Sequence, residues 1–190
     1  MLKTKYMRLT LLAAALGSAA ISGQVLAEKM TNTVNESAAK NVSKKAALSA
    51  PEQTMLMTLA QGNMAEVASA QLALTKSTNP DVLSFAKQMN EDHSKALEEI
   101  GELAKNKGLE LPKASDAKHA DALKKMNTLS KAEFDKQYLA KAGVEDHTAT
   151  LKLLKEIQAK AKDADFKALA KKLEPTVQAH LDKAHLLHKK

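Results

Sequence analysis

The sequence contains no cysteine and no tryptophan, and its single arginine is Arg8. The absence of cysteine excludes disulfide frameworks, thiolate catalysis and lipid attachment at a leader cleavage site. Aromatic residues make up only 3% of the chain. Proteins that read nucleic acid usually need arginine for bidentate contacts and aromatic rings for base stacking. We therefore expect no nucleic-acid partner, and we interpret the lysines as a solvated surface.

The first 27 residues have the pattern of a secretory signal peptide. Three basic residues precede an uncharged apolar stretch, 9–21, which is too short to span a bilayer as a mature helix. Val25 and Ala27 satisfy the small-residue rule for cleavage after Ala27. The sequence thus predicts export to the periplasm and a mature chain without a transmembrane segment; an uncleaved amino-terminal anchor is the alternative.

Cleavage would also change the charge of the protein. The leader carries three of the 29 basic residues and none of the 22 acidic ones, so the net charge falls from +7 to +4. Weak contact with an anionic envelope surface stays open as a partner interaction. Residues 28–48 are polar and rich in Asn and Ser, which predicts a flexible leader. Residues 49–190 are long enough for one folded domain with its own core.

Helix start and stop signals divide this domain into four long helices and one short one. Ser-x-x-Glu capping boxes, a first-turn proline and a terminal glycine supply most of the boundaries. The long helices are expected over about 49–76, 79–108, 130–160 and 163–188, the last beginning at Asp163 or Asp165, and the short one over 116–127. The sequence therefore predicts an all-α protein.

The lengths of the connections predict how these helices are arranged. Short links join the first helix to the second and the third to the fourth, so each pair should form an antiparallel hairpin. The link 108–130 is long enough to return along the whole second helix, which lets the second and third helices run parallel. A weak repeat agrees with two related hairpins, since the Glu-Asp-His of 91–93 recurs at 145–147. We expect a ferritin-like four-helix bundle whose crossover contains the short helix.

Each long helix carries one polar residue in its apolar stripe: Glu66, His93, His147 and His180. Side chains of four facing helices converge on one point in a bundle. One carboxylate and three imidazoles form a donor set for a single Zn, Fe, Mn or Cu ion. Asp92 and Asp146 lie about 100° around the helix from the adjacent histidines, so they are interpreted either as outer hydrogen-bond partners or as solvated acids.

A metal-free interpretation stays open beside this one. A buried glutamate that accepts from a protonated histidine, with further imidazoles in a chain, satisfies itself without a metal. Di-iron oxidase chemistry is argued against, because the Glu-x-x-His pairs that it needs are absent. No nucleophile with a base, and no phosphate-binding loop, is evident. The two hypotheses are therefore a metal-binding envelope protein and a structural, stress or envelope-interaction protein; an enzyme is disfavoured.

Several segments resemble a known family: 60–66 (AQGNMAE), 79–82 (NPDV), 85–86 (FA), 89–93 (MNEDH), 111–112 (LP), 134–138 (FDKQY), 144–147 (VEDH) and 174–181 (EPTVQAHL). Together they resemble the bacterial exported proteins grouped as domain of unknown function 4142, over about residues 51–188. The resemblance implies a ferritin-like fold and a periplasmic or envelope location. It implies no activity, and the family pattern matches around Glu66, His93, His147 and His180.

Overall fold

The computed structural model describes residues 47–189. The predicted signal peptide, 1–27, and nearly all of the predicted leader, 28–48, lie outside the described residues. The described elements are α1 (Ala50–Lys76), α2 (Pro80–Asn106), α3 (Ala117–Asn127), α4 (Lys131–Tyr138), the π-helical segment η1 (Leu139–Asp146), α5 (His147–Lys160) and α6 (Ala164–His188). Residues 47–189 contain no strand, and none of their helices has the length and hydropathy of a membrane span.

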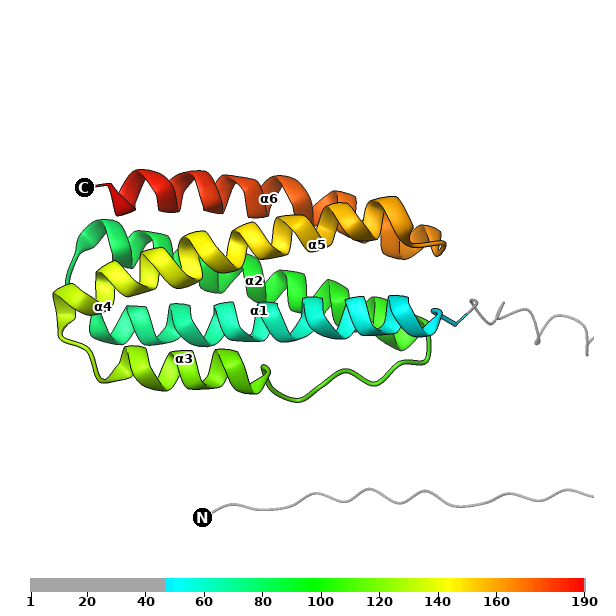
Figure 1. Cartoon of the computed structure of the whole chain (residues 1–190), viewed down its shortest axis with the longest axis horizontal. Coiled ribbons are helices and arrows are strands. Elements are labelled where there is room, and N and C mark those ends of the chain that lie inside the picture. The colour runs from blue at the N-terminus through cyan, green and yellow to red at the C-terminus, as the bar shows by residue number, and fades with distance from the viewer. Residues whose placement is uncertain (1–46, 190) are drawn as a thin grey trace, which may run out of the picture. The chain divides into compact units, whose positions relative to one another are not determined.

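The long helices pack side by side as a bundle (Figure 1). α1 packs mainly against α2, α5 packs mainly against α6, and α6 also packs against α2. The members of each hairpin run in opposite directions, whereas α2 and α5 run in the same direction. The connection between α2 and α4 returns along α1 and includes α3. The prediction of an all-α four-helix bundle is confirmed.

Local hydrogen bonding explains where the helices begin and end. Ser49 and Glu52 form the predicted capping box, and the Asn79 side chain accepts from the Asp81 N–H at the start of α2. Asp163 caps α6 in the same way. Gly108 follows α2 with a φ of 69°, a conformation that glycine adopts without the steric cost of a Cβ atom. These helix boundaries were predictable because each depends on a few neighbouring residues.

The third long helix differs from the prediction. An uninterrupted α-helix was expected from 130 to about 160, but η1 separates α4 from α5. A π-helical segment inserts one residue into the α-helical hydrogen-bond register, and such insertions are frequent at functional sites. The residues after it are therefore rotated relative to the stripe that a regular helix predicts.

Two apolar clusters fill the bundle on either side of the polar layer. One cluster contains Leu56, Ile100, Leu154 and Phe166 together with Leu48, the last residue of the predicted leader. The other contains Phe85, Met89, Phe134 and Tyr138. Burying each such side chain stabilises the fold by roughly 1.5–3 kcal/mol. The apolar packing on both sides fixes the position of the buried polar residues along the bundle axis.

Glu52 joins the start of α1 to the start of α6. Its Oε2 accepts from the Ser49 N–H at 2.9 Å, and its Oε1 accepts from the backbone N–H groups of Lys162 and Asp163 at 2.7 and 2.9 Å. The hydrogen bond from the Ser49 hydroxyl and those from the backbone lower the pKa of Glu52 to about 2. One carboxylate thus caps two helices that lie more than a hundred residues apart in the sequence.

We expect Glu52→Gln to lower the free energy of unfolding at neutral pH by about 1–3 kcal/mol, because an amide replaces a charged acceptor of several N–H groups. A depressed pKa stabilises the fold above the unfolded-state pKa, and this contribution is lost as the pH falls toward the folded-state pKa. The gap between wild type and variant should therefore shrink between about pH 5 and pH 2. Chemical denaturation at several pH values measures it, with Glu133→Gln as the control because Glu133 is exposed and caps only its own helix. A gap that is constant with pH would contradict this account.

Candidate metal centre

Three histidines from three different helical elements meet between the two apolar clusters. His93 lies on α2, His147 begins α5 and His180 lies on α6. His147 Nε2 is 3.3 Å from His93 Nε2 and 3.3 Å from His180 Nδ1, and the three ring nitrogens all lie within 4.8 Å of one another. The residues are 4%, 1% and 0% exposed, respectively. They are the only group of three or more potential metal-binding side chains with this spacing among residues 47–189.

In each of two rings, the nitrogen that faces away from the other histidines, here called the outward nitrogen, is hydrogen-bonded to an oxygen atom. His147 Nδ1 lies 2.7 Å from the backbone oxygen of Ala142, and His180 Nε2 lies 2.9 Å from Asp92 Oδ2. A carbonyl or carboxylate oxygen can only accept a hydrogen bond, so both outward nitrogens carry the hydrogen. In the neutral ring the inward nitrogen then presents its lone pair.

The same argument holds for the third ring. His93 Nδ1 lies 2.8 Å from Asn63 Oδ1, and Asn63 Nδ2 donates to the backbone oxygen of Leu59 at 2.8 Å. The bond to Leu59 orients the amide, so its oxygen faces His93 and accepts from Nδ1. His93 Nε2 is therefore the lone-pair nitrogen.

Three lone pairs thus converge on one point. Burial lowers the pKa of His93 well below its usual range, lowers that of His147 to about 4, and lowers that of His180. Burial therefore favours the neutral form of all three rings near pH 7. Two nitrogen lone pairs at 3.3 Å do not bond to each other, so a cation shared between the rings would stabilise the cluster.

The spacing of the cluster fits a tetrahedral metal ion. Zinc binds histidine nitrogen at about 2.0–2.1 Å, and two vertices of such a tetrahedron lie about 3.3 Å apart. The two short nitrogen–nitrogen distances match that edge. Three protein ligands leave one vertex for an exogenous group, which is the pattern of an open rather than a closed zinc site. Each ligand also donates its other N–H to an oxygen, as metal-binding histidines almost always do.

Glu66 lies outside this group, in contrast to the predicted four-residue layer. Its Oε1 is 3.8 Å from His147 Nδ1, the ring nitrogen that faces away from the other histidines. Glu66 is buried, and its Oε2 has no hydrogen-bond partner among residues 47–189. Burial, with a smaller contribution from the charge of Asp146, raises the pKa of Glu66 well above its usual range. The structure therefore places beside the histidine cluster a carboxyl group whose neutral form is favoured by burial.

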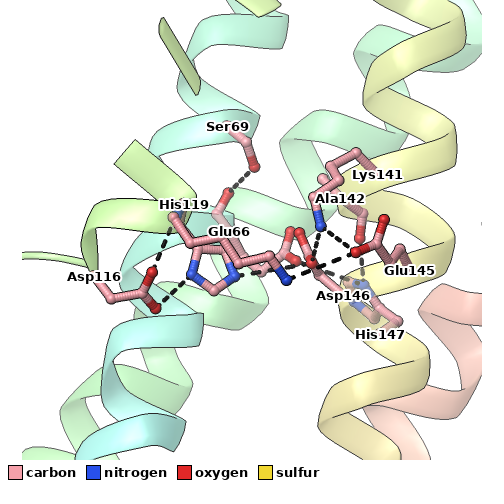
Figure 2. A network of polar contacts seen from close by, with 10 residues as sticks. Glu66, Ser69, Asp116, His119, Lys141, Ala142, Glu145, Asp146 and His147 are labelled. Carbon is pink, nitrogen blue, oxygen red and sulfur yellow. Dashed lines mark hydrogen bonds and ion pairs between the residues drawn. The ribbon is translucent and has the colours of Figure 1, made fainter. Parts of the chain in front are cut away.

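The two aspartates predicted as outer partners have different surroundings. Asp92 accepts from His180 on another helix, not from its neighbour His93. Asp146 contacts Lys141 at 2.8 Å and lies 3.8 Å from His119 Nε2. Figure 2 shows this second network, in which His119 on α3 lies between Asp146 and Asp116. Asp92 therefore orients a histidine of the cluster, whereas Asp146 ties η1 to α3.

Sequence reasoning missed two residues of this region, Asn63 and His119. Asn63 lies one turn before Glu66 on α1, and its position in the helical period was the signal that could have found it. The sequence pattern favours a surface position for His119, but its side chain is only partly exposed and bonds to Asp116. The nearby carboxylates of Asp146 and Asp116 raise the pKa of His119.

The π-helical segment brings His147 into the cluster. His147 Nδ1 donates to the carbonyl of Ala142, five residues earlier, at 2.7 Å. Gly143 lets η1 approach α6 closely, because a Cβ atom added there would lie 2.7 Å from the Cβ atom of Ala184. Ala184 is one turn beyond His180. The contact at Gly143 therefore sets the distance between the elements that carry two of the histidines.

We expect Gly143→Ala to lower zinc affinity by about tenfold or more, within the range found when an outer partner of a ligand is lost. The added methyl group meets a backbone-attached carbon, so η1 and α6 must move apart, at a cost of about 1–3 kcal/mol in stability. Gly101→Ala is the matched control, because a Cβ atom added at Gly101 would have nothing within 4 Å. That helix-interior change should raise stability by up to about 1 kcal/mol. Zinc titration measures the affinity of each variant and chemical denaturation measures its stability. Equal zinc affinities in the two variants would contradict the role of Gly143 in positioning the histidines.

A family model described as "Domain of unknown function (DUF4142)" matches residues 37–187. No curated protein sequence matches the chain. Among solved structures, the crystal structure of a DUF305 fragment from Deinococcus radiodurans is similar, with 14% sequence identity, a TM-score of 0.67, and coverage of 76% of this chain and 99% of the fragment. At this identity the similarity supports the helical-bundle fold alone.

Proposed function

The chain belongs to the DUF4142 family, and we propose that its bundle binds one transition-metal ion through His93, His147 and His180. The observation that carries the proposal is the convergence of three buried ring nitrogens, each left unprotonated because the opposite nitrogen donates to an oxygen. A bound cation would turn three facing lone pairs into three ligand bonds. The proposed activity is metal binding. The name of the family assigns no reaction to its members.

The donor set favours zinc among the candidate metals. Neutral imidazoles suit zinc, copper and iron, whereas manganese prefers carboxylate and water oxygens. Two of the three nitrogen–nitrogen distances match a tetrahedral edge, and zinc is the metal for which that geometry is usual. Copper and iron are the competitors that a metal analysis must include. The adjacent Glu66 carboxyl group contacts the outer nitrogen of His147 and is not one of the three clustered ligands.

The second candidate is a metal-free structural network. The contact that favours it is the one between His180 Nε2 and Asp92 Oδ2, at 2.9 Å, because a carboxylate stabilises an imidazolium. A proton on His180 Nδ1 could then bridge to His147 Nε2. One proton satisfies one of the two 3.3 Å contacts and leaves His93 Nε2 without a partner. The metal-bound form satisfies all three nitrogens, which is why we prefer it.

Metal content tests the proposal. Untagged protein is purified without chelators and its metals are measured by inorganic mass spectrometry, beside a His93→Ala, His147→Ala double variant. We expect close to one zinc, copper or iron ion per wild-type chain and almost none in the variant. Wild-type protein that is metal-free and that gains no stability from any of these ions would establish the structural network instead.

We also propose that the protein is exported and acts in the periplasm or at the envelope. The proposal depends on the basic, apolar and small-residue pattern of the first 27 residues. Expression in a Gram-negative host should give periplasmic protein whose amino terminus is Glu28. Leu12→Arg places a charge in the apolar stretch, so it should leave unprocessed protein inside the cell. Uncleaved wild-type protein that is found in the inner-membrane fraction would instead identify an amino-terminal anchor.

A further inference from the structure

A cavity of about 130 Å³ lies directly beside the histidine cluster, between α2 and α6. His93 and His180 line it, and His180's partner Asp92 lines it as well. A second cavity, lined by Glu66, His119 and residues of α3 and α5, contains none of the three clustered histidines in its wall. Of these two cavities, only the first gives an exogenous molecule access to the proposed metal ion.

The first cavity connects the buried centre with solvent. Its inner wall is formed by buried residues that include Leu59, Ala96 and Leu154, whereas Lys95 and Lys172 at the rim are exposed. The wall is therefore mainly apolar between a polar floor and a charged rim. A cavity of this size is comparable with one that holds benzene in another protein, so it accommodates a small organic molecule.

The charges specify what kind of molecule would bind. A divalent ion held by three neutral imidazoles keeps its full charge, and Asp92 offsets only part of it. The free tetrahedral vertex therefore favours an anionic oxygen ligand over neutral water. At the rim, Lys172 Nζ pairs with Glu99 Oε2 at 2.7 Å, while Lys95 adds a second cation. The two lysines balance the carboxylates of Asp92 and Glu99, which also line the cavity, so the proposed metal ion would supply the attraction for an anion.

We propose that this cavity binds a small monocarboxylate, whose carboxylate occupies the free position of the metal ion and whose hydrocarbon part lies against Leu59, Ala96 and Leu154. The inference depends on the proposed metal centre and specifies the class of molecule that reaches it. Burial of each additional methylene against an apolar wall is expected to tighten binding about three- to fourfold. Affinity should therefore rise from acetate through propionate to butyrate.

Cobalt substitution provides the test. The full chain is loaded with Co²⁺, whose visible absorption bands report changes in its ligands, and is titrated with acetate, propionate and butyrate. We expect each carboxylate to change the bands saturably, with progressively tighter binding along the series. Ala96→Leu fills the cavity and should weaken butyrate binding at least tenfold without altering Co²⁺ stoichiometry or the spectrum before titration. Leu173→Phe, at a partly buried lining position, is the second cavity-filling variant.

Ala149→Leu is the matched control, because Ala149 is exposed and lines the second cavity but not the first. It should bind butyrate as the wild type does. Bands that do not respond to any carboxylate, or that respond equally in both cavity-filling variants, would overturn the carboxylate site and leave the metal centre intact. Failure of the wild type to bind Co²⁺ through its histidines would overturn the metal centre, and the carboxylate site with it.

Discussion

Replacing His147 with alanine is expected to lower zinc affinity by more than about 100-fold. Loss of an outer partner of a metal ligand typically costs about 10- to 100-fold, and loss of the ligand itself must cost more. His147 is the central ring, since its Nε2 lies 3.3 Å from both of the other inward nitrogens. Without it, His93 and His180 retain two ligands from α2 and α6, too few for a tight zinc site.

Competition with a chromophoric chelator measures this change. His185→Ala is the control, because His185 is an exposed histidine on α6 and belongs to no cluster of potential ligands in the described part of the chain. Its zinc affinity should equal that of the wild type. Similar affinities for the His147 and His185 variants would mean that zinc binds elsewhere.

The second large effect expected is a rise of roughly 8–16 °C in the wild-type melting temperature when free zinc is about a thousandfold above its dissociation constant. A ligand that binds only the folded state then contributes about 4 kcal/mol. In a domain of this size, each kcal/mol shifts the melting temperature by about 2–4 °C. The effect is linked to the cluster because the unfolded chain cannot hold three histidines together.

Calorimetric or circular-dichroism melting with and without zinc measures the shift. The His93→Ala, His147→Ala variant should melt at the same temperature in both conditions, and a chelator should reverse the shift in the wild type. An equal rise in the double variant would show that zinc stabilises the bundle through other residues, such as the network around His119 and Asp116.

The boundaries of the helices could be predicted because they depend on local chemistry. The Ser49–Glu52 capping box, the Asn79 cap and the glycine at 108 each involve residues within a few positions of one another. The π-helical segment could not be predicted in this way. Its extra residue is accommodated by close packing of Gly143 against Ala184, which lies on a different helix.

The same distinction applies to the candidate centre. The helical period identified all three clustered histidines, because each occupies the buried stripe of its own helix. Periodicity gives the face of a helix but not the direction of a side chain within the layer, so it grouped Glu66 with them although Glu66 meets the outer nitrogen of His147. The pairing of Asp92 with His180 joins α2 to α6, and only the packing of those helices reveals it.

X-ray absorption at the zinc edge tests the central claim most directly, because it reports the atoms around the metal in the zinc-loaded wild-type protein. The account predicts three imidazole nitrogens and one further light atom at about 2.0–2.1 Å. It also predicts that the signal of one imidazole disappears in any zinc retained by the His147→Ala variant. A shell of oxygen atoms without multiple imidazoles in the wild type would contradict the three-histidine centre.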